Sequence, residues 1–193
     1  MVQDQLRDRG IRDERVLTAM ADVPRDHFLD PGRQSRAYAD EAVPIDAGQT
    51  ISQPWVVARM TELLAPAPGD RILELGTGSG YQGAILAALD LAGGVTIRTT
   101  DGSLGDPGGA PWDGIIVTAA APSIPTELRD QLADGGRLVI PVGPRDHQIL
   151  TLVVREGDTW RDTPHGAVVF VPLIGPGGFP EDDDQRSRRR RWF

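Results

Sequence analysis

The spacing of apolar residues divides the chain into alternating helical and extended segments. Within residues 54–64, Val56, Val57, Met60 and Leu63 recur at the spacing of one helix face, which predicts an amphipathic helix. Short apolar runs bounded by glycine, proline or aspartate predict buried strands. We place these strands at residues 71–75, 95–100, 114–118, 137–142, 148–155 and 167–171.

Further helices are predicted on either side of these strands. Residues 1–20 form two short helices, the second capped by Asp13, and another helix spans residues 125–132. Strands that alternate with helices are typical of an α/β fold with a mostly parallel sheet, covered on both faces, here ending in a strand pair. A helix over residues 81–89 is expected to point Tyr81, Ala84, Ile85, Ala88 and Leu89 inward.

Two segments lack this periodicity. Residues 24–50 contain several turn-forming residues and interleaved aromatic and small residues, which favours a functional loop. The end of the chain is rich in glycine and proline, then acidic, then rich in arginine, so we expect residues 176–193 to be a disordered tail. A solvated end is the simplest interpretation of the arginines, and a weak contact with nucleic acid or an acidic partner is the alternative.

Composition excludes several classes of function. The net charge is -8, which gives no field that would attract nucleic acid. The chain has no cysteine, and its three histidines show no metal-ligand spacing, so no metal site is expected. No apolar run is long enough to span a bilayer and no secretory signal is visible, so we expect a cytoplasmic protein without membrane contact.

A strand, a glycine loop and a helix follow one another within residues 71–89. Gly76, Gly78 and Gly80 allow a sharp turn and a close approach to a ligand, although a purely structural turn is the alternative. Glu74, just before the loop, would repel a pyrophosphate but suits the positively charged amino end of S-adenosylmethionine. The loop also lacks the G-x-G-x-x-G spacing of dinucleotide-binding proteins, which makes a nicotinamide-dependent enzyme a distant alternative.

Seven short segments together carry a resemblance to one enzyme family. The segments are Val23-Pro24-Arg25, Ala37-Tyr38, Thr50-Ile51-Ser52-Gln53-Pro54, Leu73 to Gln82, Ile116 to Ala120, Pro141-Val142-Gly143 and Phe170 to Leu173. They resemble the bacterial protein-L-isoaspartate O-methyltransferases. The similarity covers roughly residues 1–174, and the serine segment and the glycine loop occur in the family's order and spacing.

The resemblance implies a fold, a reaction and a set of site residues. The fold is a Rossmann-like methyltransferase fold over residues 1–175, with a helical, substrate-side segment at 1–64 and a cofactor-binding core at 65–175. The reaction is methyl transfer from S-adenosylmethionine to the free α-carboxylate of L-isoaspartyl residues in damaged proteins or peptides, by a protein expected to be a monomer. Ser52 is the implied active-site residue, for which a plain helix N-cap is the alternative. The implied cofactor-binding residues are Glu74, Gly76, Thr77, Gly78, Gly80, Asp101 and Gly102, although Thr100 replaces the first glycine of the family's Gly-Asp-Gly segment.

The sequence departs from the family after the glycine-loop helix. The family has a second strand there, which ends in a ribose-binding acid, and then a helix, whereas this chain passes from Leu89 almost directly to Val95. A βα unit of roughly two dozen residues is therefore missing. Either cofactor binding is lost with it, or the strand at 95–100 takes the vacated place and Asp101 takes over the ribose contact.

Three functions remain open at this stage. The first is the isoaspartyl methyltransferase, whose substrate carboxylate is already ionised near neutral pH and needs no general base. The second is a related carboxylate methyltransferase that serves a modified-peptide pathway. The third is a catalytically impaired binding protein that keeps residues 24–50 for peptide contact.

Overall fold

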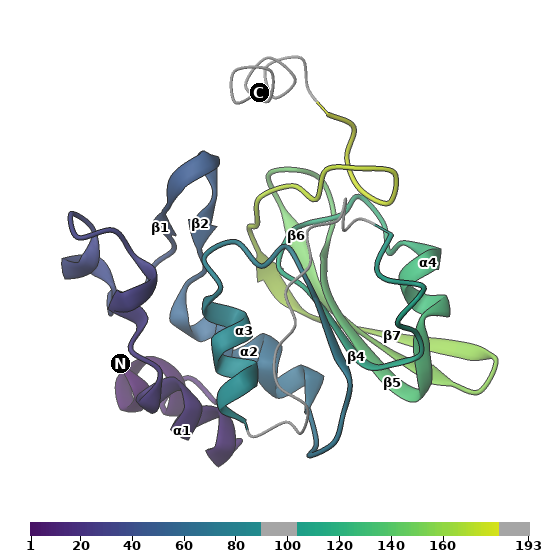
Figure 1. The fold of residues 1–193 in the computed structure, drawn as a ribbon, viewed down its shortest axis with the longest axis horizontal. Helices are drawn as coiled ribbons and strands as arrows, with labels where there is room; N and C mark the ends of the chain where they lie inside the picture. The colour runs from purple at the N-terminus through teal and green to yellow at the C-terminus, as the bar shows by residue number, and fades with distance from the viewer. Residues whose placement is uncertain (90–103, 182–193) are drawn as a thin grey trace.

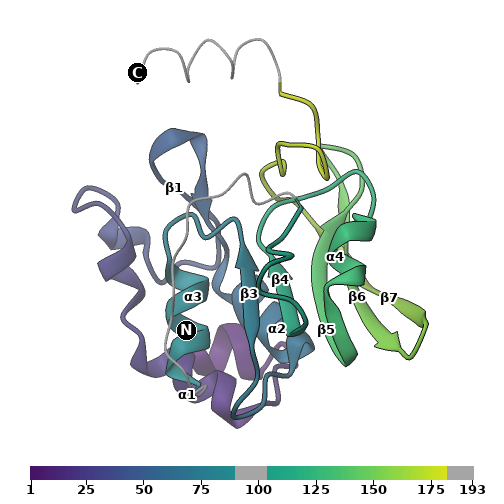
Figure 2. The ribbon, with the colours of Figure 1, turned by 45° about the vertical axis from the view of Figure 1, so that its right-hand side comes forward.

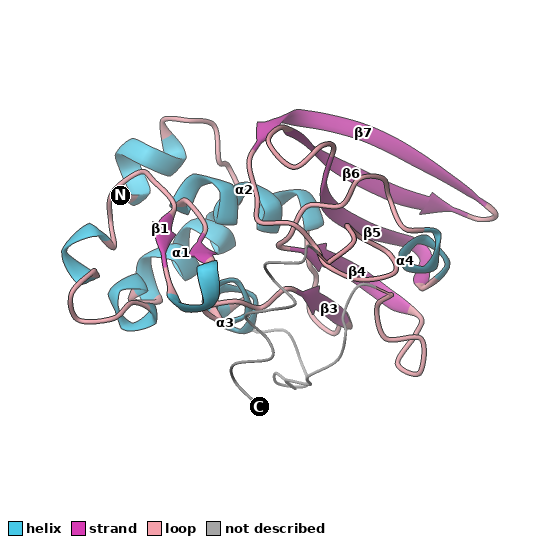
Figure 3. Ribbon diagram, turned by 90° about the horizontal axis from the view of Figure 1, so that it is seen from above, coloured by secondary structure: helices cyan, strands magenta, loops and turns pink. Residues whose placement is uncertain are grey.

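The computed structural model describes residues 1–89 and 104–181, and within them a mixed sheet of five strands dominates. Strands β3, β4 and β5 run parallel, whereas β6 and β7 are antiparallel to their neighbours, and β7 lies at the outer edge (Figure 1, Figure 3). The predicted α/β fold with a strand pair at its end is thereby confirmed. In sheet order the strands are β3 (Ile72–Leu75), β4 (Trp112–Val117), β5 (Leu132–Val142), β6 (Gln148–Glu156) and β7 (Thr159–Val168).

Helices cover both faces of this sheet. The helices α1 (Glu14–Asp22), α2 (Pro54–Leu64) and α3 (Tyr81–Ala88) lie on one side, and α4 (Thr126–Asp130) lies on the other (Figure 2). Successive residues of a strand point to opposite faces, so Ile116 of β4 packs in the cluster with α1 to α3. Its neighbours Ile115 and Val117 pack in the cluster that contains Leu128 of α4.

The N-terminal half is built from short elements. A π-helical turn covers Val2–Arg7, and 3-10 turns cover Arg25–Phe28, Gln34–Arg36 and Asp46–Gly48. A two-stranded antiparallel hairpin of β1 (Val43–Pro44) and β2 (Thr50–Ile51) leads directly into α2. The segment predicted as irregular, residues 24–50, therefore contains three short turns and one small hairpin.

Several predicted boundaries are wrong. The last strand was expected at 167–171, but β7 ends at Val168 and begins at Thr159, and β5 begins at Leu132 rather than at residue 137. In α3, Ala88 is exposed rather than inward, while Gln82 and Leu86 are buried. The predicted strand at 95–100 lies outside the described residues.

Two further predictions concern the ends of elements. Asp13 caps α1 as expected, because its Oδ1 accepts a hydrogen bond of 2.9 Å from the Arg15 backbone N–H. The first residues of the predicted tail are packed, since the Phe179 N–H donates to the Leu173 carbonyl at 2.7 Å and Arg145 lies over the Phe179 ring.

Two classes of feature were searched for throughout residues 1–89 and 104–181. In that part of the chain no helix is long and apolar enough to cross a membrane. Nor do three or more histidine or acidic side chains gather there in a way that could hold a metal ion.

Candidate functional site

The glycine loop lies at the carboxyl end of β3. Gly76, Gly78 and Gly80 have φ values of +84°, +53° and +82°, a left-handed conformation that residues with a Cβ rarely adopt. The chain thereby reverses within five residues, from the end of β3 to the first residue of α3. This is the strand–loop–helix unit that the sequence predicts.

The loop is tied to the neighbouring strand. The hydroxyl of Thr118, just after β4, donates to the carbonyls of Leu75 at 3.1 Å and Gly76 at 2.5 Å. A Cβ added at Gly76 would lie 3.1 Å from the Thr118 Oγ1, so glycine is required here for space as well as for conformation. The carboxyl ends of β3 and β4 therefore form one rigid edge, which is where ligands of open α/β sheets bind.

The serine segment approaches this edge from the other side. Ser52 follows β2 directly and precedes α2, whose N-cap is Gln53 and whose first residue is Pro54. The prediction that Ser52 caps this helix is therefore wrong. The side chain of Gln53 instead donates to the Asp40 carboxylate at 2.8 Å. Among the described residues, the Ser52 hydroxyl has no hydrogen-bond partner, which leaves it available to a ligand.

A cleft separates the glycine loop from the serine segment. It brings together four of the predicted site residues, namely Ser52, Gly76, Thr77 and Gly78. Gly80 and Glu74 flank the cleft without lining it, and Asp101 and Gly102 lie outside the described residues. The other lining residues are Thr50, Ile51, Val57, Met60, Ser79, Tyr81, Gln82 and Thr118.

A second cavity of about 400 Å³ lies on the other side of the serine segment. Thr50 and Ser52 line both spaces, so the two cavities share a wall at the serine that the family resemblance implies as the active-site residue. The side chain of Trp55 belongs to its wall and is covered by the Arg9 guanidinium, 4.9 Å from the ring centre. The remaining lining residues are Arg9, Ala42, Gln53, Val56, His147, Ala167, Val168, Val169 and Phe170.

Glu74 is buried beneath the first turn of α3. Its Oε2 lies 2.8 Å from the position that a Cβ on Gly83 would take, so the carboxylate contacts the helix where no side chain intervenes. Its Oε1 is buried without a hydrogen-bond partner among the described residues. Burial raises the pKa of this carboxyl to about 7, because the charged form loses its hydration. An unpartnered buried acceptor of this kind fits a cationic donor such as the amino end of S-adenosylmethionine.

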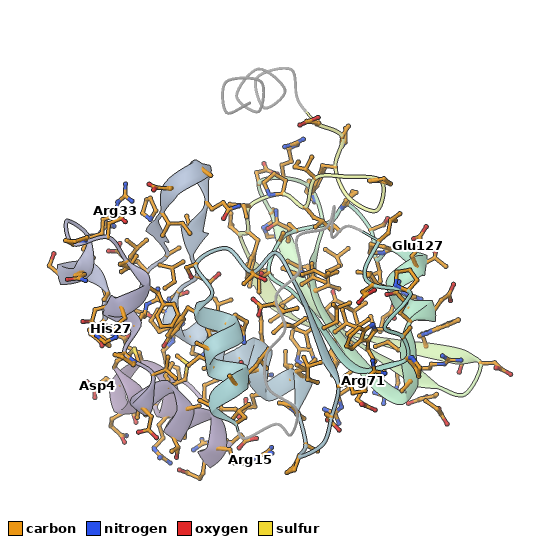
Figure 4. The ribbon with its side chains drawn as sticks, viewed as in Figure 1. Asp4, Arg15, His27, Arg33, Arg71 and Glu127 are labelled. Atoms are coloured by element: carbon orange, nitrogen blue, oxygen red, sulfur yellow. The ribbon has the colours of Figure 1, made fainter. Side chains whose placement is uncertain are left out.

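Arg25 holds the segment of residues 24–50 against α3. Its side chain is fully buried, its Nε donates to the Ala37 carbonyl at 2.7 Å, and its guanidinium lies 4.9 Å from the centre of the Tyr81 ring. Burial lowers the pKa of this guanidinium to about 10, a value at which it still carries its charge at neutral pH. Figure 4 shows His27 and Arg33 of the same segment on the side of the molecule away from Arg71, the residue before β3.

Sequence reasoning missed several residues of the two cavities. Gln82 and Thr118 lie inside segments that carry the family resemblance, but nothing in their spacing indicated a role. Trp55 was assigned only to a helix, and Phe170 to a strand and to a segment of the family resemblance, because an aromatic residue in an apolar pattern is usually a core residue. Both line one cavity wall although they are far apart in the sequence, and no local pattern encodes such a contact.

Comparison with known proteins bears on the whole chain. The family model for protein-L-isoaspartate(D-aspartate) O-methyltransferase matches residues 1–94 and 87–177. The protein-L-isoaspartate O-methyltransferase of Methanoregula boonei is 48% identical over 202 aligned positions, which cover 93% of each chain. The protein of the same name from Roseiflexus sp. (strain RS-1) is 50% identical over 195 positions, which cover 89% of each chain.

The same comparisons locate the missing unit. The two segments matched by the family model meet at residues 87–94, where the sequence predicts the loss of a βα unit. An alignment of 202 positions that covers 93% of 193 residues leaves roughly two dozen positions without a residue in this chain. The length of that gap supports the loss of one strand and one helix.

Two solved structures share the fold. A protein-L-isoaspartate O-methyltransferase aligns with a TM-score of 0.78 and 23% identity, over 99% of this chain and 70% of its own. A candidate enzyme of the same name from Plasmodium falciparum, in complex with S-adenosyl-L-homocysteine, aligns with a TM-score of 0.72 and 23% identity over 90% of this chain and 96% of its own. Because the family model spans nearly the whole chain and relatives are 48% and 50% identical to it, this chain belongs to the protein-L-isoaspartate(D-aspartate) O-methyltransferase family.

Proposed function

We propose that this protein transfers a methyl group from S-adenosylmethionine to the free α-carboxylate of L-isoaspartyl residues in damaged proteins or peptides. The observation that carries the proposal is the meeting of two cavities at Thr50 and Ser52. Methyl transfer requires the donor and the acceptor to meet at one point from opposite directions. The glycine-loop cleft is the place for the donor, and the cavity beside Trp55 is the place for the peptide.

The residues in and beside the cleft fit the amino-acid end of the cofactor. Backbone N–H groups at the start of α3 suit its carboxylate, and the unpartnered Oε1 of Glu74 suits its ammonium group. When bound, S-adenosylmethionine supplies a methyl group already activated by its positively charged sulfur. The residues Gly76, Thr77, Gly78 and Gly80 then hold the cofactor by shape, because their backbone approaches without obstruction.

The reaction requires little from the protein beyond the placement of the two reactants. The substrate carboxylate is ionised at neutral pH and attacks the methyl carbon directly, so that an O–C bond forms as the S–C bond breaks. Holding two reactants in line contributes roughly 7–11 kcal/mol to such a reaction. The half-buried Ser52 is suited to donate a hydrogen bond to the carboxylate oxygen that is not attacking, which would orient the other toward the cleft.

The ribose contact is assigned from the sequence. Asp101 follows Gly80 by about the spacing at which a ribose-binding acid is expected, roughly 20 residues, and would replace the acid lost with the missing unit. An Asp101→Asn variant is expected to bind S-adenosylmethionine more weakly than the parent. Equal affinity would remove Asp101 from the site.

The proposal is tested by methyl transfer from labelled S-adenosylmethionine to two synthetic peptides. The peptides share one sequence and differ only in an L-isoaspartyl or a normal aspartyl linkage. We expect methyl ester on the isoaspartyl peptide alone, and a large loss of turnover in Ser52→Ala with nearly unchanged affinity for S-adenosylhomocysteine. Binding of the cofactor without turnover would instead favour the impaired binding protein.

Two finer expectations accompany this function. We infer from the sequence a cytoplasmic protein that acts as a monomer on isoaspartyl proteins in general. Gel filtration with light scattering checks the oligomeric state. A strong preference for one aspartate-rich peptide over unrelated isoaspartyl peptides would favour the modified-peptide pathway.

A further inference from the structure

Gln82 is a polar residue in an apolar position. It is the second residue of α3, its side chain is only 6% exposed, and it lines the glycine-loop cleft. Its Nε2 donates to the Thr61 hydroxyl at 2.9 Å, and that hydroxyl donates to the Val57 carbonyl at 2.8 Å. The side chain therefore links α3, which follows the glycine loop, to α2, which follows Ser52.

This chain of hydrogen bonds fixes which way the amide faces. The hydroxyl of Thr61 has one proton, and the Val57 carbonyl takes it, so the hydroxyl can only accept from Gln82. The amide atom that faces Thr61 must then be the nitrogen. The Oε1 of Gln82 is turned away from Thr61 and has no partner among the described residues, although it is buried.

The other unpartnered acceptor of this region belongs to Glu74 of β3, which packs against the same turn of α3. The carboxylate of Glu74 contacts Gly83, the residue after Gln82, and its Oε1 is also buried without a partner among the described residues. Two buried acceptors without partners are unfavourable, so a ligand that brings hydrogen-bond donors to them would be stabilised. A primary ammonium group offers three N–H donors and a positive charge in one compact group, whereas a peptide N–H offers a single donor without charge.

We propose that the Oε1 of Gln82 accepts a hydrogen bond from the α-ammonium group of S-adenosylmethionine, with Thr61 holding the amide in position. Glu74 of β3, packed against the same turn, supplies the opposite charge, and the N-terminal N–H groups of α3 remain for the carboxylate of the same amino-acid end. The inference rests on the proposed function only in taking S-adenosylmethionine as the ligand of the cleft. It makes Gln82 a residue that selects ligands with a free amino group.

Two ligands separate this role from a structural one. S-adenosylhomocysteine carries the α-ammonium group, whereas 5′-methylthioadenosine has the same nucleoside and sulfur without the amino-acid end. Calorimetric titration of Gln82→Met, which keeps the length of the side chain, is expected to show about tenfold or greater loss of affinity for S-adenosylhomocysteine. Affinity for 5′-methylthioadenosine is expected to stay within about twofold of the parent.

Companion variants sharpen the result. Thr61→Val keeps the shape but releases the amide, so a loss smaller than that of Gln82→Met is expected. Gln131→Met is the matched control, because Gln131 is also buried but donates to the Leu104 and Glu127 carbonyls on the far face of the sheet.

Three outcomes would overturn the inference. If Gln82→Met loses affinity equally for both ligands, the role of Gln82 is only to link two helices. Unchanged affinity for S-adenosylhomocysteine with a raised KM for the isoaspartyl peptide would assign the Oε1 to the substrate, and would leave the proposed function intact. Failure of the parent protein itself to bind S-adenosylhomocysteine would overturn both.

Discussion

At the scale of single residues, Glu74 makes the stability of the ligand-free protein depend on pH. Its pKa is about 7 in the folded state and 4.5 in its ordinary state, so the folded protein holds a proton that the unfolded chain releases between these values. The free energy of unfolding is therefore expected to fall as pH rises from 4.5 to 7, by up to roughly 3 kcal/mol. Urea unfolding across this range, for the parent and for Glu74→Gln, measures the effect, and the variant is expected to lose that part of the slope.

The same carboxyl makes ligand binding depend on pH in the opposite direction. A cation beside Glu74 favours the ionised form, so binding below pH 7 must release its proton. Affinity for S-adenosylhomocysteine is then expected to fall by up to about tenfold per pH unit below 7. Calorimetric titration in two buffers of different ionisation enthalpy detects the released proton. If the parent protein binds S-adenosylhomocysteine at pH 6 without releasing a proton, no cation reaches Glu74.

Gly76 tests whether the loop itself is built for a ligand. An alanine there must adopt a φ of +84° and place its Cβ 3.1 Å from the Thr118 Oγ1. We expect a loss of stability of roughly 1–2 kcal/mol or more and weaker binding of S-adenosylhomocysteine. Gly157→Ala is the control, because Gly157 has a φ of +63° in the β6–β7 turn with open space around it. A comparable fall in affinity in both variants would mean that general destabilisation, not the loop, weakens binding.

At the scale of elements, α1 packs on α2 and α3, the two helices that begin at the site. Asp13→Ala removes the side-chain cap of α1 and is expected to lower the free energy of unfolding by about 1 kcal/mol, because the N–H of Arg15 loses its acceptor. Asp22→Ala, at the other end of the same helix, removes a charge that the helix dipole disfavours and is expected to change stability by less than about 0.5 kcal/mol. Chemical denaturation of the pair checks the difference, and equal losses would show that charge rather than capping matters.

The elements also show where sequence patterns suffice. The unit of β3, glycine loop and α3 was predicted almost to the residue, because an apolar run, three glycines and an apolar helix face are all local signals. By contrast, β7 was placed eight residues too late, since Pro164 and charged residues in 159–166 are typical of a loop. As the edge strand, β7 tolerates this proline, which pairs with Thr151 next to a shift in register.

The serine segment shows a different limit. Ser52 has the residue type of an N-cap and stands at the start of a helix, so the pattern was sound. Ser52 instead lies between β2 and the helix, and Gln53 takes the capping position while its side chain donates to Asp40. The preference for a cap is worth only about 1 kcal/mol, and the pairing of β1 with β2 and the contacts of Gln53 outweigh it here.

At the scale of the whole molecule, the missing βα unit leaves β3 at the edge of the sheet formed by the described residues. β3 spans only Ile72–Leu75, yet it contains Glu74 and leads directly into the glycine loop. Within the described residues, β3 pairs with a strand on one side only, namely β4, and the site depends on this strand. A neighbour on its open side would bury more of the apolar surface that stabilises it. The loss of the βα unit is therefore expected to lower both the free energy of unfolding of the protein and its affinity for the cofactor.

A chimera tests this directly. Inserting between Leu89 and Val95 the roughly two dozen residues that the Roseiflexus relative has at this place would restore one strand and one helix. Because the slope of unfolding free energy against urea scales with the surface exposed on unfolding, the restored protein is expected to show a steeper slope and a higher midpoint. It is also expected to bind S-adenosylmethionine more tightly, since the family resemblance implies a ribose-binding acid in this segment. An unchanged slope would mean that the inserted residues stay unpacked, whereas a steeper slope with unchanged affinity would mean that Asp101 already serves in place of the lost acid.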